Sequence, residues 1–336
     1  MSRIFIPEGY KSELGLKDTQ IAIKKVKDFF QSQLSAELNL QRVSAPLFVD
    51  PESGLNDNLN GVERPVSFGI KEQNERQAEI VHSLAKWKRY ALGRYGFKPG
   101  EGLYTDMNAI RRDEETDNVH SIYVDQWDWE RIITKEERTK ETLEEIVKCV
   151  YEALHVTEKY VANKYDYVKC ILPEQITFVT TQELEDMYPD LTPKERENAY
   201  LRTHHTVFLM QIGGKLKSGQ PHDGRAPDYD DWELNGDLIF WNRTLEQAFE
   251  VSSMGIRVSP ESLDRQLTLA GCDERRELPF HKALLNGELP YTIGGGIGQS
   301  RLCMLMMGTA HIGEVQSSIW DDETSRVCAE KGILLL

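Results

Sequence analysis

Two long stretches of the chain place apolar residues at helical spacing. Residues 19–38 carry one broad apolar face, and Asp18 or Thr19 can cap the helix that this face predicts. Residues 135–165 repeat the same period and are predicted to form a second long helix whose role is packing. The face of the first helix consists of Ile21, Ile23, Val26, Phe29, Phe30, Leu34 and Leu38.

Shorter apolar runs predict β-strands. In the run 40–49, Pro46 cannot donate a hydrogen bond to a sheet, so we expect this strand to lie at an edge or to break there. The sequence Thr192-Pro193-Lys194-Glu195 is typical of a helix start. Further strands are predicted over residues 78–81, 103–111, 120–130, 176–179 and 206–212, with an antiparallel hairpin over 234–242 and 248–257.

The predicted strand over residues 120–130 has one polar side. Alternation places Gln126, Asp128 and Glu130 on the side of Ile122 and Val124, and Tyr123, Asp125, Trp127 and Trp129 on the other. Polar atoms buried without partners are costly. We therefore expect the side that carries Gln126 and Asp128 to face a ligand.

A glycine-rich stretch, GGGIGQSR over residues 294–301, lies between two apolar runs. Glycine is used where backbone approaches another group closely or takes a positive φ, so this stretch predicts a strand that passes into a helix over a flat ligand. Its spacing fits neither a Rossmann fingerprint nor a P-loop. A turn that merely caps a core helix has about equal weight on spacing alone, and the cation of Arg301 favours the ligand.

Three polar segments each allow two interpretations. In the turn-rich loop 54–61, Asp57 is about twice as often a structural turn residue as a ligand. Lys86, Lys88 and Arg89 follow the possible cap Ser83, and they are either solvated or bind an anion. The acidic loop 219–232 is either solvated or anchors an amino group, with equal weight.

Composition narrows the class of protein. The net charge of −15 argues against a nucleic-acid surface and leaves small metabolites and a divalent cation as partners. Five cysteines form no CxxC pair, and no apolar run suits a signal peptide or a membrane span, so we expect a cytoplasmic protein. No linker or repeat divides residues 1–336, which we expect to form one domain with an N-terminal arm over 1–18.

Three segments resemble the signatures of class II aminoacyl-tRNA synthetases. The helix and proline-containing strand over 19–49 resemble the first, the hairpin over 110–128 the second, and GGGIGQSRL the third, although Ser300 stands where an acid is usual. The resemblance implies that Arg111 holds the α-phosphate of ATP, with Arg112 as the weaker candidate, and that Arg301 stacks on the adenine. The stretch Glu250-x-x-Ser-x-Gly-x-Arg is similar to the metal-binding stretch of aspartyl- and asparaginyl-type synthetases, with Asp237 as the second Mg²⁺ ligand.

Longer blocks resemble bacterial asparagine synthetase A, the ammonia-dependent aspartate–ammonia ligases, over nearly the whole chain. The blocks are residues 82–89, 123–131, 225–232 and 252–257. The resemblance implies an α+β fold of class II catalytic-core type, with an antiparallel sheet of six to eight strands flanked by helices, in a homodimer without an anticodon-binding domain. It also implies that L-aspartate, ATP and ammonia give asparagine through β-aspartyl-AMP, with neither nucleic acid nor membrane as a partner.

Site residues follow from the same resemblance. The implied catalytic residues are Arg111, Arg301, Asp57, Lys88, Gln126 and Asp128. The implied aspartate pocket comprises Asp57, Ser83, Lys88, Gln126, Asp128, Asp230, Ser253 and Arg257, while ATP is expected at Arg111, Glu250, Gly296, Gly298 and Arg301, with Mg²⁺ on Asp237 and Glu250. A tRNA-charging relative should carry a basic module, and an inactive regulator should lack a phosphate arginine or a metal carboxylate. The sequence favours neither alternative.

Overall fold

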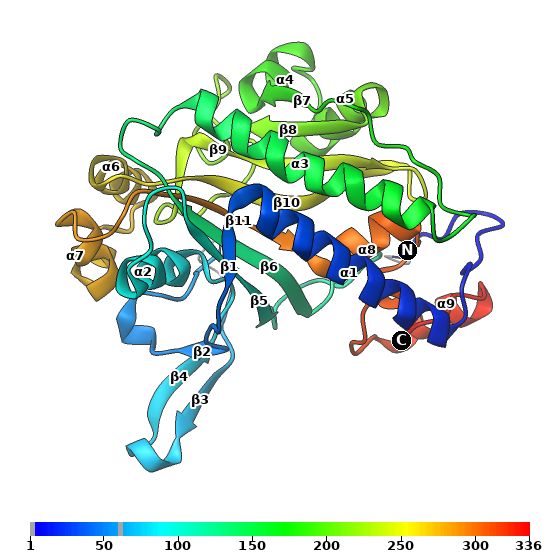
Figure 1. The fold of residues 1–336 in the computed structure, drawn as a ribbon, viewed down its shortest axis with the longest axis horizontal. Coiled ribbons are helices and arrows are strands. Elements are labelled where there is room, and N and C mark those ends of the chain that lie inside the picture. The colour runs from blue at the N-terminus through cyan, green and yellow to red at the C-terminus, as the bar shows by residue number, and fades with distance from the viewer. Residues whose placement is uncertain (1–3, 60–62) are drawn as a thin grey trace.

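A computed structural model describes residues 4–59 and 63–336 of the chain (Figure 1). Within these residues the main sheet has eight strands in the order β1-β5-β6-β11-β10-β9-β8-β7. Their bounds are β1 Leu40–Arg42, β5 Gly102–Ile110, β6 Tyr123–Ile132, β7 Thr177–Thr180, β8 Thr206–Met210, β9 Asp230–Asn242, β10 Gln247–Arg257 and β11 Thr292–Gly298.

The sheet is mixed rather than wholly antiparallel, so the prediction needs a correction at both edges. β1 pairs with β5 in parallel, and β7 pairs with β8 in parallel. Parallel neighbours need a crossover connection. The helices α4, Thr181–Met187, and α5, Pro193–His204, provide it between β7 and β8. The strands between these two edge pairs are antiparallel, and they include the predicted hairpin β9–β10.

A small second sheet forms a projecting hairpin (Figure 1). Its order is β2-β4-β3, with bounds β2 Phe48–Val49, β3 Ser67–Ile70 and β4 Arg76–Ile80. The apolar run 40–49 is therefore divided between two sheets. The chain leaves the main sheet after Arg42 and resumes pairing only beyond Pro46, which confirms the predicted break.

Three helices cover one face of the main sheet and share its largest apolar core: α1 Leu16–Leu38, α3 Lys140–Ala162 and α8 Gln299–Met307. Figure 1 shows α1 and α3 side by side across this face. Phe30 of α1 contacts Trp127 of β6 with ring centroids 4.8 Å apart. Asn39 follows the last residue of α1 in a left-handed conformation, and the helix begins at Leu16 after Gly15, before both predicted caps, Asp18 and Thr19. The helix therefore begins within the predicted arm over 1–18, whose residues 1–3 lie outside the described residues.

Shorter helices occupy the periphery and the opposite face. The packing of α2 against β5 and β6 fixes the wall of the cleft described below. The predicted cap of α5 is confirmed, since Thr192 and Glu195 form a reciprocal capping box. The remaining helical bounds are α2 Ala85–Tyr95, α6 Pro260–Ala270, α7 Pro279–Leu285 and α9 Asp322–Glu330, with 3₁₀ turns η1 Pro51–Ser53, η2 Lys71–Gln73, η3 Asp273–Glu277 and η4 Ile312–Glu314.

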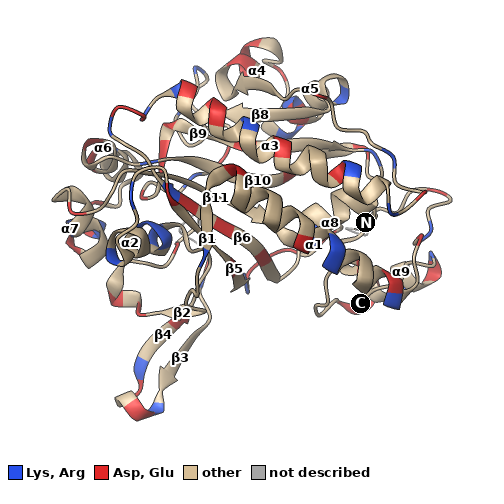
Figure 2. Cartoon of the chain, viewed as in Figure 1, with Lys and Arg blue, Asp and Glu red and all other residues tan. Residues whose placement is uncertain are grey.

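Charged residues are spread over the helices of the outer surface, with acidic groups of α3, α6 and α9 visible between basic ones (Figure 2). No disulfide joins the five cysteines, all of which lie in described segments. Within residues 4–59 and 63–336, none of the helices combines the length and apolar character needed to cross a bilayer.

Candidate active site

A cleft of about 430 Å³ opens on the face of the sheet that α1 and α3 do not cover. Strands β6, β9, β10 and β11 line it, together with the starts of α2 and α8 and the loop before β9. Apart from the weaker candidate Arg112, every site residue predicted from the sequence lies on its walls, although their chemical roles remain predictions. These residues are Asp57, Ser83, Lys88, Arg111, Gln126, Asp128, Asp230, Asp237, Glu250, Ser253, Arg257, Gly296, Gly298 and Arg301.

The glycines of β11 make room for polar side chains of β6. Gly294 lies opposite Glu130, and Gly296 lies opposite Asp128. A Cβ atom at Gly294 would overlap the Glu130 carboxylate, and one at Gly296 would overlap the side-chain amide of Gln126. Neither glycine has a positive φ. The predicted strand-to-helix passage and close approach are confirmed, and the groups approached are side chains of the neighbouring strand.

Buried cations and carboxylates alternate beneath one end of the cleft. Lys88, with none of its side chain exposed, contacts Asp128 and donates to the carbonyl of Gly295 at 2.9 Å. Burial lowers the pKa of Lys88, and the charge of Asp128 opposes that shift. Among the described residues, Oδ2 of Asp128 has no hydrogen-bond partner although it is buried. Such an acceptor is costly unless a ligand donates to it.

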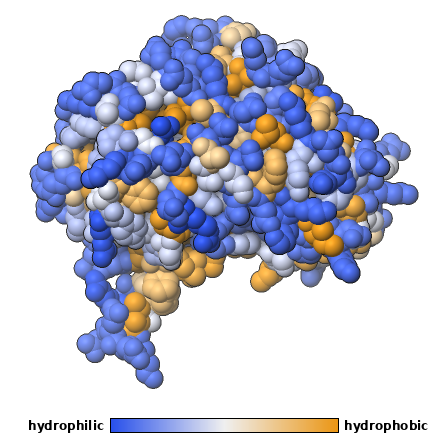
Figure 3. Space-filling view, viewed as in Figure 1, coloured by the Kyte–Doolittle hydropathy of each residue, from blue (hydrophilic) through white to orange (hydrophobic). Residues whose placement is uncertain are grey.

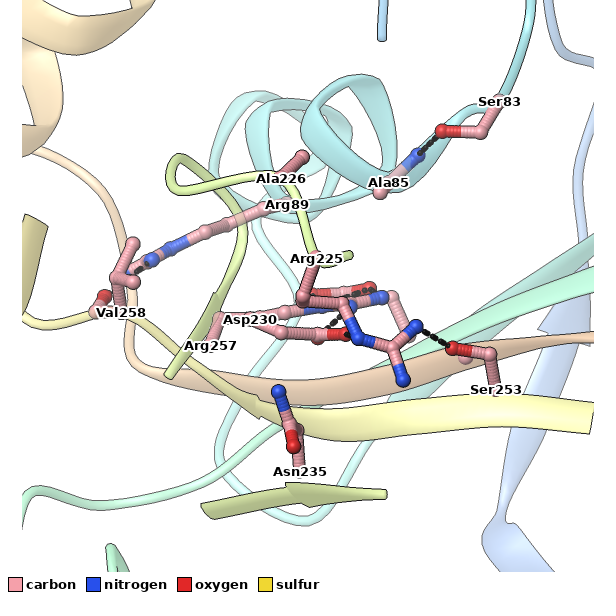
Figure 4. A network of polar contacts seen from close by, with 12 residues as sticks. Ser83, Ala85, Arg89, Arg225, Ala226, Asp230, Asn235, Ser253, Arg257 and Val258 are labelled. Atoms are coloured by element: carbon pink, nitrogen blue, oxygen red, sulfur yellow. Dashed lines mark hydrogen bonds and ion pairs between the residues drawn. The ribbon is translucent and has the colours of Figure 1, made fainter. Parts of the chain in front are cut away.

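Arg257 neutralises two further carboxylates. It donates to Glu130 at 2.8–3.1 Å and also contacts Asp230 (Figure 4). Burial lowers the pKa of the Arg257 guanidinium, but the charges of Glu130 and Asp230 outweigh burial and raise it well above its usual range. Arg257 is therefore a permanent cation that fixes the position of Asp230.

Arg225 was not predicted as a site residue, yet it reaches across the cleft from the loop before β9. Its guanidinium donates to Ser253 and to Asp237, and Figure 4 shows it pointing from the loop toward Ser253. Its Nε is buried without a partner in the described part of the chain. The available sequence signal is a lone arginine within the aspartate-rich loop 219–232.

Asp237 of β9 and Glu250 of β10 lie on neighbouring strands, and the charge of Glu250 affects the pKa of Asp237. Burial and the charge of Glu250 raise the pKa of Asp237 to about 7, although Arg225 lowers it. Burial would also raise the pKa of Glu250, but the charges of Arg301, Lys194 and Arg225 lower it. Within the described residues, no group of three or more histidine, cysteine or acidic side chains could hold a metal. Any cation here would therefore need ligands beyond these two carboxylates.

The other end of the cleft carries Arg111 and Arg301, the two arginines predicted to bind ATP. Arg301 donates to the carbonyl of Glu250 at 3.0 Å, and its guanidinium lies 5.9 Å from the ring centre of Phe249. Arg111 lines the cleft, its charge lowers the pKa of Glu250, and its Nε is buried without a partner among the described residues. The alternative Arg112 is not among the lining residues. This geometry favours Arg111.

Asp57 lies at the entrance to α2. It accepts from the hydroxyl of Ser83 at 2.8 Å and from the backbone N–H of Leu59 at 2.8 Å. Ser83 lies one residue before Leu84, the N-cap position of α2, and its hydroxyl accepts a long hydrogen bond of 3.4 Å from the N–H of Ala85 (Figure 4). The same hydroxyl orients Asp57. Part of the predicted loop 54–61 lies outside the described residues.

The run of cations at the start of α2 does not face solvent, and of its three members only Lys88 lines the cleft, where binding of an anionic ligand stays a prediction. Lys86 donates to Asp228 at 3.0 Å, and Lys88 donates to Asp128. Arg89 donates to the carbonyls of Pro290 and Val258. All three cations are buried. Burial lowers the pKa of Arg89 to about 9. The cations therefore hold the walls of the cleft in place.

The acidic loop is likewise committed to internal pairs rather than solvated as a whole. Asp228 accepts from Lys86, from Arg275 at 3.3 Å and from His281 at 2.9 Å. Asp231 accepts from Arg138 at 2.8 Å. The loop contains four aspartates, Asp223, Asp228, Asp230 and Asp231, and only Asp223 is exposed. Further lining residues that the sequence did not identify are Tyr229, His120, Asp125 and Gln316.

Solved structures with similar folds include aminoacyl-tRNA synthetases. Asparaginyl-tRNA synthetase from Pyrococcus horikoshii, complexed with asparaginyl-adenylate, aligns with a TM-score of 0.60 at 15% identity over 93% of this chain and 74% of that one. The Entamoeba histolytica asparaginyl-tRNA synthetase, also with asparaginyl-adenylate, gives 0.63 at 12% identity over 90% and 66%. At these identities the likeness shows the fold alone, which is of class II synthetase type.

Sequence comparison is more specific. The family model described as aspartate-ammonia ligase matches residues 17–332. The aspartate–ammonia ligase of Clostridium tetani is 64% identical over 334 residues, which cover 99% of this chain and 98% of that protein. The Clostridium perfringens enzyme of strain 13 is 62% identical over the full length of both chains. The chain therefore belongs to the aspartate–ammonia ligase family.

Proposed function

We propose that this chain catalyses the ATP-dependent amidation of L-aspartate by ammonia, giving L-asparagine, AMP and pyrophosphate through β-aspartyl-AMP. The observation that carries the proposal is its identity of 64% with an aspartate–ammonia ligase over almost the whole of both chains. The cleft supports it independently. Cations suited to a nucleotide occupy one end, and carboxylates paired with buried cations, which suit an amino acid, occupy the other.

In the first step, an oxygen of the aspartate β-carboxylate attacks the α-phosphorus of ATP, and the bond from that phosphorus to the bridging oxygen of pyrophosphate breaks. The step joins two anions, so it needs positive charge and positioning rather than a protein nucleophile. Arg111 and Arg301 would bind the α-phosphate and the adenine. Gln126, which lies on β6 between these arginines and the acid–base cluster, would orient the reacting carboxylate.

Asp237 and Glu250 would hold a magnesium ion. Their hard carboxylate oxygens fit Mg²⁺, which typically uses one or two carboxylates together with substrate phosphates. The raised pKa of Asp237 supports this placement, since two mutually repelling carboxylates in one cleft favour an added cation. When bound, the ion would neutralise charge on the triphosphate.

Aspartate would be recognised by the alternating charges at the other end of the cleft. The Lys88 ammonium suits a substrate carboxylate, and the unpartnered Oδ2 of Asp128 suits the α-ammonium group. Ser253 and Asp230 would complete this pocket, with Arg257 keeping Asp230 in place. A neutral substitute at Asp128 should therefore weaken aspartate binding more than ATP binding.

In the second step, the lone pair of ammonia attacks the β-carbonyl carbon of the adenylate, the C–O bond to AMP breaks, and the new nitrogen loses a proton. Asp57 is our candidate for guiding the ammonia and accepting that proton. Its carboxylate receives hydrogen bonds from Ser83 and Leu59, and among the described residues no cation forms an ion pair with it. Lys88 and Arg257 already neutralise the other candidates, Asp128 and Asp230.

Assembly and location complete the proposal. Leu47, Phe48 and Phe68 are 50%, 45% and 39% exposed at the base of the β3–β4 hairpin, where Figure 3 shows apolar atoms together. A second copy of the chain is the partner proposed for this patch, which gives a homodimer. One catalytic domain over residues 1–336, in the cytoplasm and without nucleic acid or membrane, agrees with the net charge of −15 and the unpaired cysteines.

The experiment follows asparagine and AMP with nuclease-treated protein, aspartate, ATP and magnesium, supplying either ammonium or glutamine. We expect asparagine and AMP in equal amounts with ammonium and none with glutamine. Efficient use of glutamine, or a requirement for added tRNA, would overturn the proposed substrates. ADP in place of AMP would overturn the adenylate. Binding of aspartate and ATP without turnover would identify an inactive regulator.

A further inference from the structure

The helix that carries Arg301 lacks a cap of its own. Gly298 occupies the N-cap position of α8 without a capping side chain, and the first turn contains no acidic residue. Backbone N–H groups at a helix N-terminus need acceptors when they are buried. Here the acceptor comes from a neighbouring strand: Asp125 of β6 accepts from the backbone N–H of Ser300 at 3.1 Å and from its hydroxyl at 2.9 Å.

Asp125 is buried, with 8% of its side chain exposed, and its charge is neutralised from α1. Lys27 donates to its Oδ2 at 2.9 Å. Gln316 adds a hydrogen bond to Asp125 at 3.3 Å and one to Ser300 at 3.1 Å. Although burial lowers the pKa of Lys27, the charge of Asp125 outweighs it and raises that pKa. Lys27 therefore remains charged, and a continuous chain of contacts runs from α1 to the first turn of α8.

We propose that Lys27 is a positioning residue for the nucleotide, acting through Asp125 and Ser300 on Arg301. The inference rests on the proposed function, in which Arg301 contacts ATP. Without Lys27, Asp125 would hold a buried charge that no cation compensates, which is unfavourable. The carboxylate would turn away from α8, and the N–H of Ser300 would lose its acceptor. The turn that carries Arg301 would then be less ordered.

A second chain of contacts provides an internal comparison. Arg42 of β1 contacts Asp106 at 2.7 Å, and Asp106 accepts from the side chain of Gln299 at 3.0 Å. The side chains of Arg42 and Asp106 are 58% and 35% exposed. Exposed ion pairs contribute little. We therefore expect the buried contact through Lys27, and not the exposed one through Arg42, to control the start of α8.

The test measures KM for ATP and for aspartate by aspartate-dependent ATP–pyrophosphate exchange, which needs no ammonia. Lys27→Met should raise KM for ATP by roughly tenfold because Arg301 is misplaced, and should leave KM for aspartate within about twofold. Lys27→Arg should retain most of the wild-type value. Lys24→Met is the matched control on the same helix, since Lys24 pairs with Asp28 and their side chains are 75% and 55% exposed. It should change neither constant, and neither should Arg42→Met.

A double-mutant cycle tests the route. Asp125→Asn should also raise KM for ATP, and Lys27→Met combined with Asp125→Asn should be no worse than the poorer single variant. Wild-type KM for ATP in Lys27→Met, additive effects in the cycle, or equal rises in both KM values with a lower melting temperature would each overturn the inference. These outcomes differ from failure of the proposed function, in which wild-type protein shows no exchange or Arg301→Ala is fully active.

Discussion

Replacing Gly294 by alanine should destabilise the protein far more than the same change two residues later. The added Cβ at Gly294 would overlap a carboxylate oxygen of Glu130, and would lie 2.6 Å from its Cδ and 2.7 Å from the carbonyl of Trp129. Glu130 is fully buried and receives hydrogen bonds from Arg257 at 2.8–3.1 Å. It therefore cannot move aside without breaking charge-assisted hydrogen bonds.

The expected cost combines two effects. Overpacking a tight site costs about 1–3 kcal/mol, and a hydrogen bond to a charged group contributes about 1.5–3 kcal/mol. We therefore expect Gly294→Ala to lower the free energy of unfolding by roughly 3–5 kcal/mol. At Gly296 the overlap is with the amide end of Gln126, a flexible side chain that can turn into the cleft. Gly296→Ala should cost about 1 kcal/mol or less, but it should raise KM for aspartate because Gln126 lines that pocket.

The assay is urea denaturation at one protein concentration, followed by tryptophan fluorescence. Gly214→Ala is the matched control, because a Cβ there meets no atom within 4 Å and its φ is not positive. It should change the free energy of unfolding by no more than about 0.5 kcal/mol. Equal stability of Gly294→Ala and Gly214→Ala would refute the reasoning. So would a cost at Gly296 as large as that at Gly294.

Three further predictions concern charge and assembly. Arg111→Ala should reduce kcat/KM by about 10²-fold, while Arg112→Ala, measured identically, should stay close to wild type. Because the folded-state pKa of Asp237 is raised to about 7, stability from its protonated form should be present at low pH and lost as pH rises through that value; Asp237→Asn should flatten this part of a stability–pH curve. Sedimentation should show a dimer that Phe48→Ser weakens, and a wild-type chain that remains a 38.6 kDa monomer at micromolar concentration would contradict the proposed interface.

Local pattern was enough to predict the elements that position the cleft. Alternation over 120–130 separated Gln126 and Asp128 from Trp127 and Trp129, and the structure places the two pairs on opposite faces of β6. Pro46 correctly predicted a break, because proline has no backbone N–H to donate to a neighbouring strand. Such effects depend on a residue and its near neighbours in the chain.

Pairings over long sequence separations could not be predicted in this way. Asp125 and Ser300 are 175 residues apart, and Lys27 lies 98 residues before Asp125. Nothing near Lys86 or Asp228 in the sequence indicates that their side chains form an ion pair. The local sequence of each is equally compatible with exposure to solvent. Charged residues are exposed in most proteins, so only tertiary packing reveals which of them are buried with partners.

The two sides of β6 depend on each other. Gln126 and Asp128 can face the cleft in fixed positions only if β6 cannot shift, and the residues on the other face of the strand hold it in place. Trp127 and Trp129 are fully buried against the helical layer, and Asp125 is tied to α1 and α8. Large aromatic side chains bury much apolar area in one orientation. A smaller residue at Trp127 should therefore disturb aspartate binding without touching the substrate, because a cavity in the core would let the whole strand move.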